Sequence, residues 1–274
     1  MEKFSVLMSL YEKESSLFFE QCLSSLYSQT LPASEIILVL DGKVPVSLLS
    51  VIERWENKLP LKVIPLSSNV GLGNALNEGL KYCNSDIIVR MDTDDICCSD
   101  RFLKQVEFMT LNPDVVLVGG QIQEFNNEVG DAKNVRSVPC THAEIFKFSK
   151  MKNPFNHMSV SFRKKIILSL GGYTDHFFME DYNLWLRVLG KGYKTINLKD
   201  ILVYARVGNG MVSRRRGVKY IVSEFKLAKL KCELKFQKIH EASIVFLLRS
   251  LPRLLPSMLL SLIYNYVRKN KGEL

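Results

Sequence analysis

The sequence predicts an α/β fold in which a Rossmann-like, mostly parallel central sheet is flanked by helices. In the first half of the chain, short continuous apolar runs alternate with segments whose apolar residues recur at helical spacing. Such runs are typical of parallel strands that helices cover on both faces. Tyr11, Asp41 and Asp92 directly follow three of these runs, which places them at the sheet edge where ligands bind.

The expected elements alternate regularly in the first half of the chain and less regularly in the second. Strands are expected at 4–10, 35–40, 61–66, 86–91, 115–118 and 157–162, with extended segments in 194–207. Helices are expected at 17–27, 46–57, 71–83, 101–111, 163–170, 179–189 and 217–240. We expect residues 1–215 to form one catalytic domain and residues 216–274 to form a basic and apolar helical extension.

The charge of the chain is unevenly distributed. Its 274 residues suit one large domain, or one domain with an appendage, and carry a net charge of +9. Residues 1–204 contain 22 Lys or Arg and 24 Asp or Glu, a net charge of −2. Residues 205–274 contain 15 Lys or Arg and 4 Asp or Glu, a net charge of +11. This asymmetry indicates a tail that meets an anionic surface, either a membrane leaflet or nucleic acid.

The six cysteines indicate reduced, mostly buried thiols of a cytosolic protein. They include no CxxC pair, and no histidine lies at zinc-ligand spacing from them. The apolar run at 4–10 is too short for a signal peptide, and charge follows it too early, at Glu12. That run is therefore expected to be the first strand.

The acidic segment Asp92-Thr93-Asp94-Asp95 follows a strand-like run directly. Carboxylates this close repel one another and raise one another's pKa values. A hard cation such as Mg²⁺ or Mn²⁺, bridging to substrate phosphates, would relieve that repulsion. The alternative is an Asp-rich turn that caps the next helix, but Asp100 can make that cap alone. The segment therefore favours a metal and diphosphate site.

Glycines open the helix expected at 71–83, in Gly71-Leu72-Gly73, but no GxGxxG follows the first strand. A dinucleotide-binding site of the Rossmann type is therefore not expected. The start of this helix either helps to hold a phosphate or ribose or forms a simple glycine-rich turn, and the residues leave both interpretations open.

A second acidic motif, Glu180-Asp181, begins the helix expected at 179–189 and follows a Gly171-Gly172 turn and the apolar run 177–179. The positive end of a helix dipole favours carboxylates in its first turn, so ordinary helix charge is one interpretation. The apolar setting also allows a partly desolvated carboxylate, which is a better general base than a solvated one.

With these motifs together, the chain resembles the inverting family 2 glycosyltransferases of the GT-A fold over about residues 3–215. The resemblance depends on an ordered set: a strand ending near Tyr11, Asp41, Asn69-Val70-Gly71-Leu72, Asp92-Thr93-Asp94-Asp95, Gly171-Gly172-Tyr173, Glu180-Asp181 and Leu184-Trp185-Leu186-Arg187. It implies a nucleotide-diphosphate sugar donor, usually a UDP-sugar, and a divalent metal, Mn²⁺ or Mg²⁺. The chain also looks like the bacterial enzymes of O-antigen, capsule and exopolysaccharide assembly, including the amylovoran-type glycosyltransferases.

The resemblance implies a donor site at the sheet edge. Ser9 and Tyr11 would line the pocket of the base, and Asp41 would bind the uracil. Many members carry Arg-Asn in the following helix where this chain has Leu76-Asn77, so one diphosphate or sugar contact of the family is not matched, and Asn74 or Asn77 is the candidate substitute. The further donor-binding residues implied are Asn69, Gly71 and Asn74.

The resemblance also implies the catalytic roles. Asp92 would contact the ribose or the sugar, Asp94 would bind the metal, and Asp95 would lie beside it as a second metal ligand. Asp181 would remove the proton from an acceptor hydroxyl, and Glu180 would contact the acceptor. One in-line displacement would invert the anomeric carbon, so an α-linked UDP-sugar would give a β-glycoside.

Three further basic or titratable residues are candidates for substrate contacts. His157 would bind the acceptor or the diphosphate, or has a structural role at the start of a strand. Arg206 and Arg214 would close over the donor or meet a lipid diphosphate, whereas a solvated basic face is the alternative, favoured for Arg215 and Arg216.

The tail between 243 and 267 is strongly apolar, but arginines and prolines interrupt it before any run reaches the roughly 20 residues that span a bilayer. Apolar helices flanked by arginine, beside a Lys-rich helix, favour an interfacial attachment to a membrane. Packing on the body or on a second subunit is the alternative. Membrane contact would suit a peripheral enzyme at the cytoplasmic face of the bacterial inner membrane.

The leading hypothesis is a metal-dependent inverting transferase that moves galactose or glucose from a UDP-sugar to an undecaprenyl-diphosphate-linked saccharide. A sugar nucleotidyltransferase is one alternative, but the loop at 11–15 lacks the glycines that such enzymes carry. A non-catalytic nucleotide- or nucleic-acid-binding protein is another, although the tail lacks the aromatic interleaving expected of base stacking. No nucleic-acid partner is therefore expected, and a homo-oligomer remains open.

Overall fold

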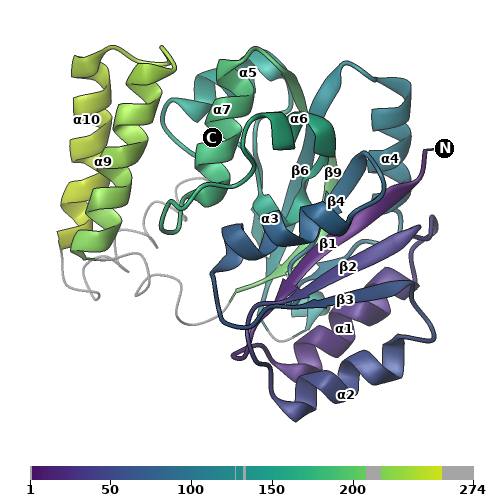
Figure 1. The fold of residues 1–274 in the computed structure, drawn as a ribbon. Helices are drawn as coiled ribbons and strands as arrows, with labels where there is room; N and C mark the ends of the chain where they lie inside the picture. The colour runs from purple at the N-terminus through teal and green to yellow at the C-terminus, as the bar shows by residue number, and fades with distance from the viewer. Residues whose placement is uncertain (1, 127, 132–133, 208–216, 255–274) are drawn as a thin grey trace.

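A computed structural model describes residues 2–126, 128–131, 134–207 and 217–254. Within them a nine-stranded sheet runs in the order β3-β2-β1-β4-β8-β6-β9-β5, β7 pairs with β6, and helices lie on both faces (Figure 1). The strands are β1 Phe4–Leu10, β2 Glu35–Leu40, β3 Leu61–Pro65, β4 Ile87–Arg90, β5 Ile96–Cys97, β6 Val115–Phe125, β7 Asn134–Arg136, β8 Ser161–Arg163 and β9 Lys194–Arg206. The α-helices are α1 Ser16–Tyr27, α2 Val46–Trp55, α3 Leu72–Tyr82, α4 Arg101–Leu111, α5 His142–Ser149, α6 Lys164–Ser169, α7 Glu180–Gly190, α9 Val218–Glu233 and α10 Ile239–Ser250.

The long strand pairings are parallel, as predicted. β1 pairs in parallel with β2 and β4, β2 with β3, and β6 with β9. The antiparallel pairings, β4 with β8, β5 with β9, and β6 with β7 and β8, are each only two or three residues long. Because β1 pairs in parallel with both β2 and β4, the carboxyl ends of these three strands share one edge. β8 lies between β4 and β6 and joins this parallel unit to the β6–β9 unit.

Two hydrophobic layers explain the placement of the helices. One face of the sheet packs against α1, α2 and α4, through residues such as Phe19, Val51 and Phe102, all of them at most 1% exposed. The other face packs against α3, α5, α6 and α7, and Trp185 of α7 is fully buried there. Because both faces of the sheet are covered, the strand sequences are continuous apolar runs and do not alternate between apolar and polar residues.

Two of the predicted strands differ clearly from those of the structure. The strand predicted at 157–162 is a 3-10 turn at His157–Ser159 followed by the short β8, because the Ser159 amide donates to the Asn156 carbonyl oxygen at 2.9 Å. The strand predicted at 115–118 extends to Phe125 because it pairs with β9 along its length.

The helix predicted at 217–240 is interrupted. It ends at Glu233, and Lys235 has a φ of 60°, which an L-residue rarely adopts and a helix cannot contain. Phe236 then stacks on Phe146 of α5, with ring centroids 4.7 Å apart, before α10 begins. α9 and α10 therefore form an α-helical hairpin whose first helix packs on α7 (Figure 1).

Two smaller predictions concern capping and the thiols. Asp100 occupies the N-cap position of α4 but makes no side-chain cap hydrogen bond, and its carboxylate pairs with Lys104 at 2.8 Å instead. All six cysteines are free, as predicted, and three of them are buried. Among the described residues, no helix has the length and apolarity that crossing a membrane requires.

Candidate active site

The predicted donor residues lie at the ends of three adjacent strands. Ser9 and Leu10 of β1 pair with Val39 and Leu40 of β2, so Tyr11 and Asp41 follow the two strands at the same level. β4 lies on the other side of β1 and delivers the acidic segment to the same edge. Side chains from three separate segments therefore meet at one edge because the strands are parallel and in register.

Asp41 organises the loop that opens α3. Its Oδ1 accepts the amide hydrogen of Val70 at 2.6 Å, and its Oδ2 accepts that of Gly71 at 3.1 Å. Asn69 returns a hydrogen bond from Nδ2 to the Asp41 carbonyl oxygen at 3.3 Å. A Cβ on Gly42 would lie 2.7 Å from the Asn69 nitrogen, so only glycine allows this approach. The start of α3 is thereby fixed beside the end of β2.

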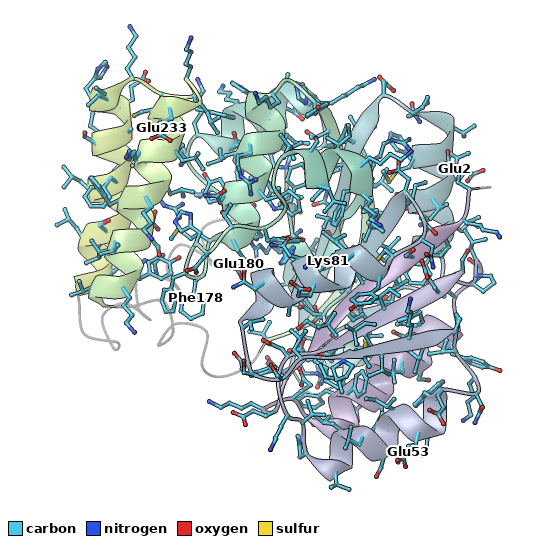
Figure 2. All side chains as sticks on the ribbon, viewed as in Figure 1. Glu2, Glu53, Lys81, Phe178, Glu180 and Glu233 are labelled. Atoms are coloured by element: carbon cyan, nitrogen blue, oxygen red, sulfur yellow. The ribbon has the colours of Figure 1, made fainter. Side chains whose placement is uncertain are left out.

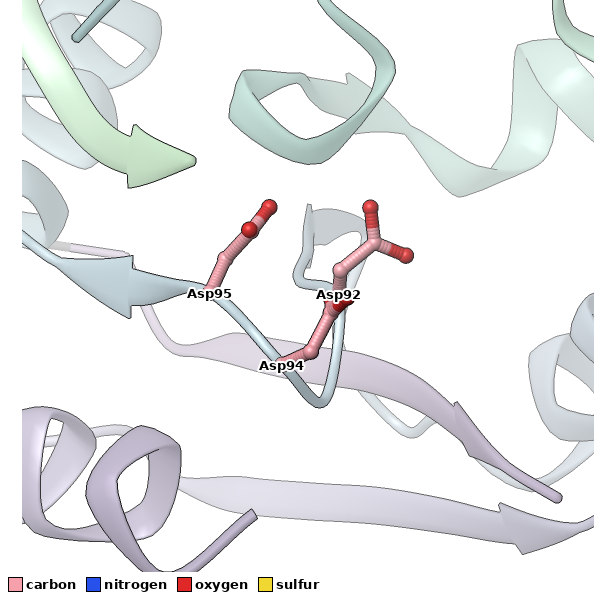
Figure 3. Close-up of side chains that lie close together, drawn as sticks. All are labelled: Asp92, Asp94 and Asp95. Atoms are coloured by element: carbon pink, nitrogen blue, oxygen red, sulfur yellow. The ribbon is translucent and has the colours of Figure 1, made fainter. Parts of the chain in front are cut away.

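The three aspartates of the acidic segment face one another on a single loop (Figure 3). One carboxylate oxygen from each of Asp92, Asp94 and Asp95 lies within 4.8 Å of the others. The Oδ1 of Asp95 accepts the amide hydrogen of Arg206 at 2.8 Å. Its Oδ2 is buried without a hydrogen-bond partner among the described residues. A buried carboxylate oxygen left unpaired beside two other carboxylates is what a cation ligand requires.

The electrostatics of this cluster support the same conclusion. Burial, reinforced by the charge of Asp92, raises the pKa of Asp94 to about 7. Burial and the charge of Asp94 raise the pKa of Asp95 well above its ordinary value. Asp94 and Asp95 fit the ligands of a hard divalent cation, which would favour their charged forms.

Glu14 is a fourth carboxylate of this region that the sequence did not single out. Its Oε2 accepts a hydrogen bond from Thr93 Oγ1 at 3.1 Å, and its Oε1 accepts one from the Ser15 amide at 2.7 Å. Burial is the main cause of its raised pKa, and the charge of Asp92 adds to it. Glu14 therefore ties the loop after β1 to the acidic segment.

The second acidic pair lies at the start of α7. Asn153 Nδ2 donates to Asp181 Oδ2 at 2.7 Å, and the Tyr182 amide donates to Asp181 Oδ1 at 2.7 Å. Burial raises the pKa of Asp181, while these two hydrogen bonds oppose the increase. Burial, with the charge of Asp181 next, raises the pKa of Glu180 to about 7. Asp181 is therefore a carboxyl group of fixed orientation, and Glu180 is one whose pKa lies near neutral pH.

Arg90, the last residue of β4, is a buried cation between the two acidic groups. It is 1% exposed and forms an ion pair with Asp92. Its Nε and Nη1 have no hydrogen-bond partner among the described residues, and Arg101 Nη2 holds its carbonyl oxygen at 2.7 Å. The positive charge of Arg90 opposes the pKa increases of four carboxyl groups: Asp94, Asp95, Glu180 and Asp181.

His157 belongs to a chain of contacts that joins α3 to α7. Its Nε2 lies 2.9 Å from the Tyr173 hydroxyl, and burial holds the pKa of this histidine well below its usual range. The Tyr173 backbone exchanges two hydrogen bonds with the Asn77 side chain, at 2.8 and 2.7 Å. Asn77 therefore supports the Gly171-Gly172 turn, and His157 is neutral near pH 7.

The remaining predicted residues are placed less directly at the site. Asn74 Nδ2 donates to the Val70 carbonyl oxygen at 2.9 Å, within the first turn of α3. Arg206 lies between the rings of Phe18 and Phe125, and its Nε donates to the Asp94 carbonyl oxygen at 3.1 Å. Arg206 thus holds the acidic loop through its hydrogen bonds to Asp94 and Asp95. Arg214 lies outside the described residues.

Comparisons with known proteins agree with this geometry. The model of the family described as "Glycosyl transferase family 2" matches residues 5–170. The amylovoran biosynthesis glycosyltransferase AmsE of Erwinia amylovora is 47% identical over 97% of this chain and 99% of its own length. The UDP-Gal:alpha-D-GlcNAc-diphosphoundecaprenol beta-1,3-galactosyltransferase of Escherichia coli is 39% identical over 97% of this chain and 96% of its own length.

Solved structures share the fold. S. aureus TarS in complex with UDP-GlcNAc has a TM-score of 0.69 at 20% identity, over 90% of this chain and 72% of that chain. The mannosyltransferase PcManGT of Pyrobaculum calidifontis, in complex with GDP-Man and Mn²⁺, has a TM-score of 0.64 at 17% identity, over 97% of this chain and 80% of that chain. The chain has a GT-A-like α/β fold, belongs to glycosyl transferase family 2 and is a glycosyltransferase.

Proposed function

We propose that this enzyme transfers a hexose from a UDP-sugar to a sugar carried on a lipid diphosphate, with inversion, in the synthesis of a bacterial surface polysaccharide. The observation that carries the proposal is the meeting of two carboxylate groups, Asp92-Asp94-Asp95 and Glu180-Asp181, on either side of the buried Arg90. The names of the relatives from Erwinia amylovora and Escherichia coli favour polysaccharide synthesis and UDP-galactose, with UDP-glucose as the second donor to test.

The donor would lie along the edge formed by β1, β2 and β4. Ser9 and Tyr11 would line the base pocket, and Asp41 would contact the uracil while it holds the loop that precedes α3. Asp92, fixed by Arg90, would contact the ribose or the sugar. The start of α3 would lie near the diphosphate, through Asn69, Gly71 and Asn74.

Asp94 and Asp95 would hold the divalent ion, Mn²⁺ or Mg²⁺. The unpaired Oδ2 of Asp95 and the raised pKa values of both carboxyl groups fit such an ion. When bound, the ion neutralises charge on the departing diphosphate. Arg206 would keep the loop that carries these ligands in place through its hydrogen bonds to Asp94 and Asp95.

Asp181 would act as the general base. Its raised pKa gives it a greater affinity for the acceptor proton than a solvated aspartate has, and Asn153 and the Tyr182 amide fix its orientation. Glu180 would contact the acceptor, and the neutral His157 would support the acceptor side through Tyr173. Removal of the hydroxyl proton and attack on the face opposite the diphosphate would convert an α-linked donor to a β-linked product.

The α9–α10 hairpin would bring the enzyme to the membrane that carries its acceptor, at the cytoplasmic face. α10 exposes a row of apolar side chains, where a surface helix ordinarily exposes polar ones. These are Ile244, Leu247 and Leu248, and Leu251 directly after the helix continues the row; each is at least 50% exposed. With the net charge of +11 in residues 205–274, this face fits an anionic leaflet. Leu248→Glu should weaken sedimentation with anionic vesicles, and a wild type that stays in the supernatant would contradict the attachment.

The transfer itself is tested with a synthetic lipid-diphosphate-linked GlcNAc acceptor, Mn²⁺, and UDP-galactose or UDP-glucose in parallel. We expect a disaccharide with one donor, and proton NMR of its anomeric signal should give the large coupling of a β-linkage. An α-linked product would contradict the inverting mechanism, and the absence of transfer from either donor would contradict the proposed substrates.

A further inference from the structure

The α9–α10 hairpin contacts the protein body next to the proposed base. α9 packs on α7, the helix that begins with Glu180 and Asp181. Figure 2 shows Glu180 and Phe178 on the side of the body that faces the hairpin. A helix pair whose only role was membrane attachment would not need to contact this part of the site.

Three charged residues are enclosed where the hairpin meets the body. Glu224 and Lys231 of α9 are each 2% exposed, and Arg249 of α10 lies against them. Both carboxylate oxygens of Glu224 accept hydrogen bonds from Arg249, at 2.6 and 2.9 Å. The two cations also donate to the backbone of the body. Lys231 Nζ reaches the Lys150 carbonyl oxygen at 2.7 Å, and Arg249 Nη1 reaches that of Met151 at 2.8 Å.

The backbone that these cations hold leads directly to Asn153. This residue donates from Nδ2 to Asp181 Oδ2 at 2.7 Å, and its Oδ1 accepts the Phe155 amide hydrogen at 3.2 Å. Asn153 lies in an extended turn between α5 and β8, so its position depends on how residues 150–152 are held. Lys231 and Arg249 therefore hold the backbone three and two residues before Asn153, whose side-chain amide orients Asp181.

The same cations contact the residue that follows Asp181. Lys231 Nζ lies 4.9 Å from the ring centre of Tyr182, and the Arg249 guanidinium lies 5.8 Å from it. The Tyr182 hydroxyl donates to the Ser149 carbonyl oxygen at 2.6 Å, and its backbone amide donates to Asp181. Tyr182 of α7 thus contacts both the hairpin and the end of α5.

A third contact fixes the loop that precedes α7. His176 Nε2 lies 2.8 Å from the Ser223 carbonyl oxygen of α9. Phe178 has a φ of 57°, an unusual conformation for a bulky residue, and its ring centroid lies 6.4 Å from that of Tyr220. Strained backbone of this kind persists where surrounding contacts impose it, and it occurs preferentially at functional sites.

We infer that the α9–α10 hairpin positions the general base, because Glu224 orients Arg249, and Arg249 and Lys231 fix the segment that presents Asn153 to Asp181. The inference depends on the proposed function, in which Asp181 is the base. A buried ion pair is a poor source of stability compared with well-packed apolar side chains, since desolvation offsets most of the attraction. It supplies direction instead, because four hydrogen bonds from Lys231 and Arg249 are aimed at two carbonyl groups and one carboxylate. Glu224, Lys231 and Arg249 are positioning residues, and they do not touch the substrates.

The test compares Arg249→Met with Arg249→Lys and with Lys229→Met in the full chain. Lys229 lies on α9 of the same hairpin and pairs with Glu233 on the surface, so its substitution is a matched control. We expect Arg249→Met to lower kcat between about 10-fold and 100-fold at saturating donor and Mn²⁺, because small displacements of a base are costly. Arg249→Lys should recover part of the loss, and Lys229→Met should match the wild type. UDP–Mn²⁺ binding, measured by calorimetry, should stay within about twofold for all three.

A double-mutant cycle with Asn153→Ala separates positioning from a general loss of structure. If Arg249 acts through Asn153, the double variant should lose no more kcat than the worse single variant. The hydrogen bond from Asn153 lowers the pKa of Asp181, so both single variants should move the acid limb of the kcat–pH profile to higher pH. Arg90, Arg136, Glu180 and Tyr173 also act on Asp181 or share its surroundings, and neither substitution removes them. Arg249 itself lowers the pKa of Tyr182 and that of Lys231, which burial lowers to about 7, so Asn153→Ala, which keeps Arg249 in place, is the reference for the shift.

The outcomes are distinct. Additive losses, an unchanged pH profile, or UDP–Mn²⁺ affinity that falls along with kcat in Arg249→Met would overturn the inference. Wild-type kcat in Arg249→Met would do so as well. A wild type that transfers no sugar while it binds UDP with Mn²⁺ would instead refute the proposed acceptor chemistry, because the hairpin variants would then have no loss to show.

Discussion

The proposed donor edge and the proposed acceptor side of this enzyme are held in place in different ways. At the donor edge, Asp41 follows β2 and Asp92 follows β4, the two strands that pair in parallel with β1 on either side, and the register of the sheet alone brings them to one edge. On the acceptor side, Asp181 depends on Asn153, which depends in turn on Lys231 and Arg249, far along the chain. A site built on strand ends is determined by local sequence, whereas one built on helix packing is determined by distant contacts.

The largest expected effect is on the acceptor side. Asp181→Asn keeps the size of the side chain and removes its ability to take a proton, so kcat should fall between about 10²-fold and 10⁴-fold. UDP–Mn²⁺ affinity should not change, because Asp181 lies outside the donor edge. Steady-state kinetics and calorimetry on the same preparation check both parts. A variant that loses donor binding as well would show that the two sides are not separate.

This comparison explains what the sequence could predict. Apart from the two-residue β5, the order of strands and helices through α4 and the three positions at strand ends follow from periodicity and from the rule that parallel strands present their carboxyl ends at one edge. The acidic segment was identified because three carboxylates directly after a buried strand have no packing explanation. These signals are local, and they were sufficient to place these residues at one edge of the sheet.

The features that the sequence did not predict depend on partners distant along the chain. Glu14 looks like an ordinary loop residue until Thr93 is seen beside it. Asn153 is one of many polar residues in the second half, and only the fold brings it to Asp181. The helix break at Lys235 contains no glycine or proline that would predict it from the sequence. It accompanies the packing of Phe236 on Phe146, which only the fold shows. Arg90 is different, because a charged residue within the apolar run 86–91 is itself a local signal of a functional role.

A second prediction concerns the cation that lies between the two sides. Arg90→Met removes the ion-pair partner of Asp92 and the positive charge that offsets the surrounding carboxylates. We expect the KM for the UDP-sugar to rise about tenfold, because the diphosphate would then approach an uncompensated negative cluster. Initial rates at varied donor concentration measure this directly.

Arg163→Met is the matched control for Arg90→Met. Arg163 lies on the neighbouring β8, is also largely buried and also faces an aspartate, Asp86, but it donates to the carbonyl oxygens of Met109 and Val115. Its loss should lower the melting temperature without a change in donor KM. Equal effects of the two substitutions on KM would mean that Arg90 acts only through the stability of the sheet.

The smallest expected effect is a dependence of stability on pH. The pKa of Glu180 in the folded protein is raised to about 7, above its ordinary value, so its stabilising contribution is complete at low pH and is lost as the pH rises through 7. Glu180→Gln removes that cost. It should stabilise the protein by about 1 kcal/mol at pH 8, after allowance for partial solvent exposure, and by almost nothing at pH 5. Thermal melts at the two pH values would contradict this prediction if the difference were the same at both.

The central claim, a donor site in which the acidic loop binds a metal, is tested most directly by calorimetric titration of UDP into the wild type and Asp94→Ala, with and without Mn²⁺. The account predicts that Mn²⁺ strengthens UDP binding to the wild type by at least about tenfold and that Asp94→Ala abolishes this gain. Equal UDP affinity with and without Mn²⁺ in the wild type, or a gain that persists in Asp94→Ala, would contradict it.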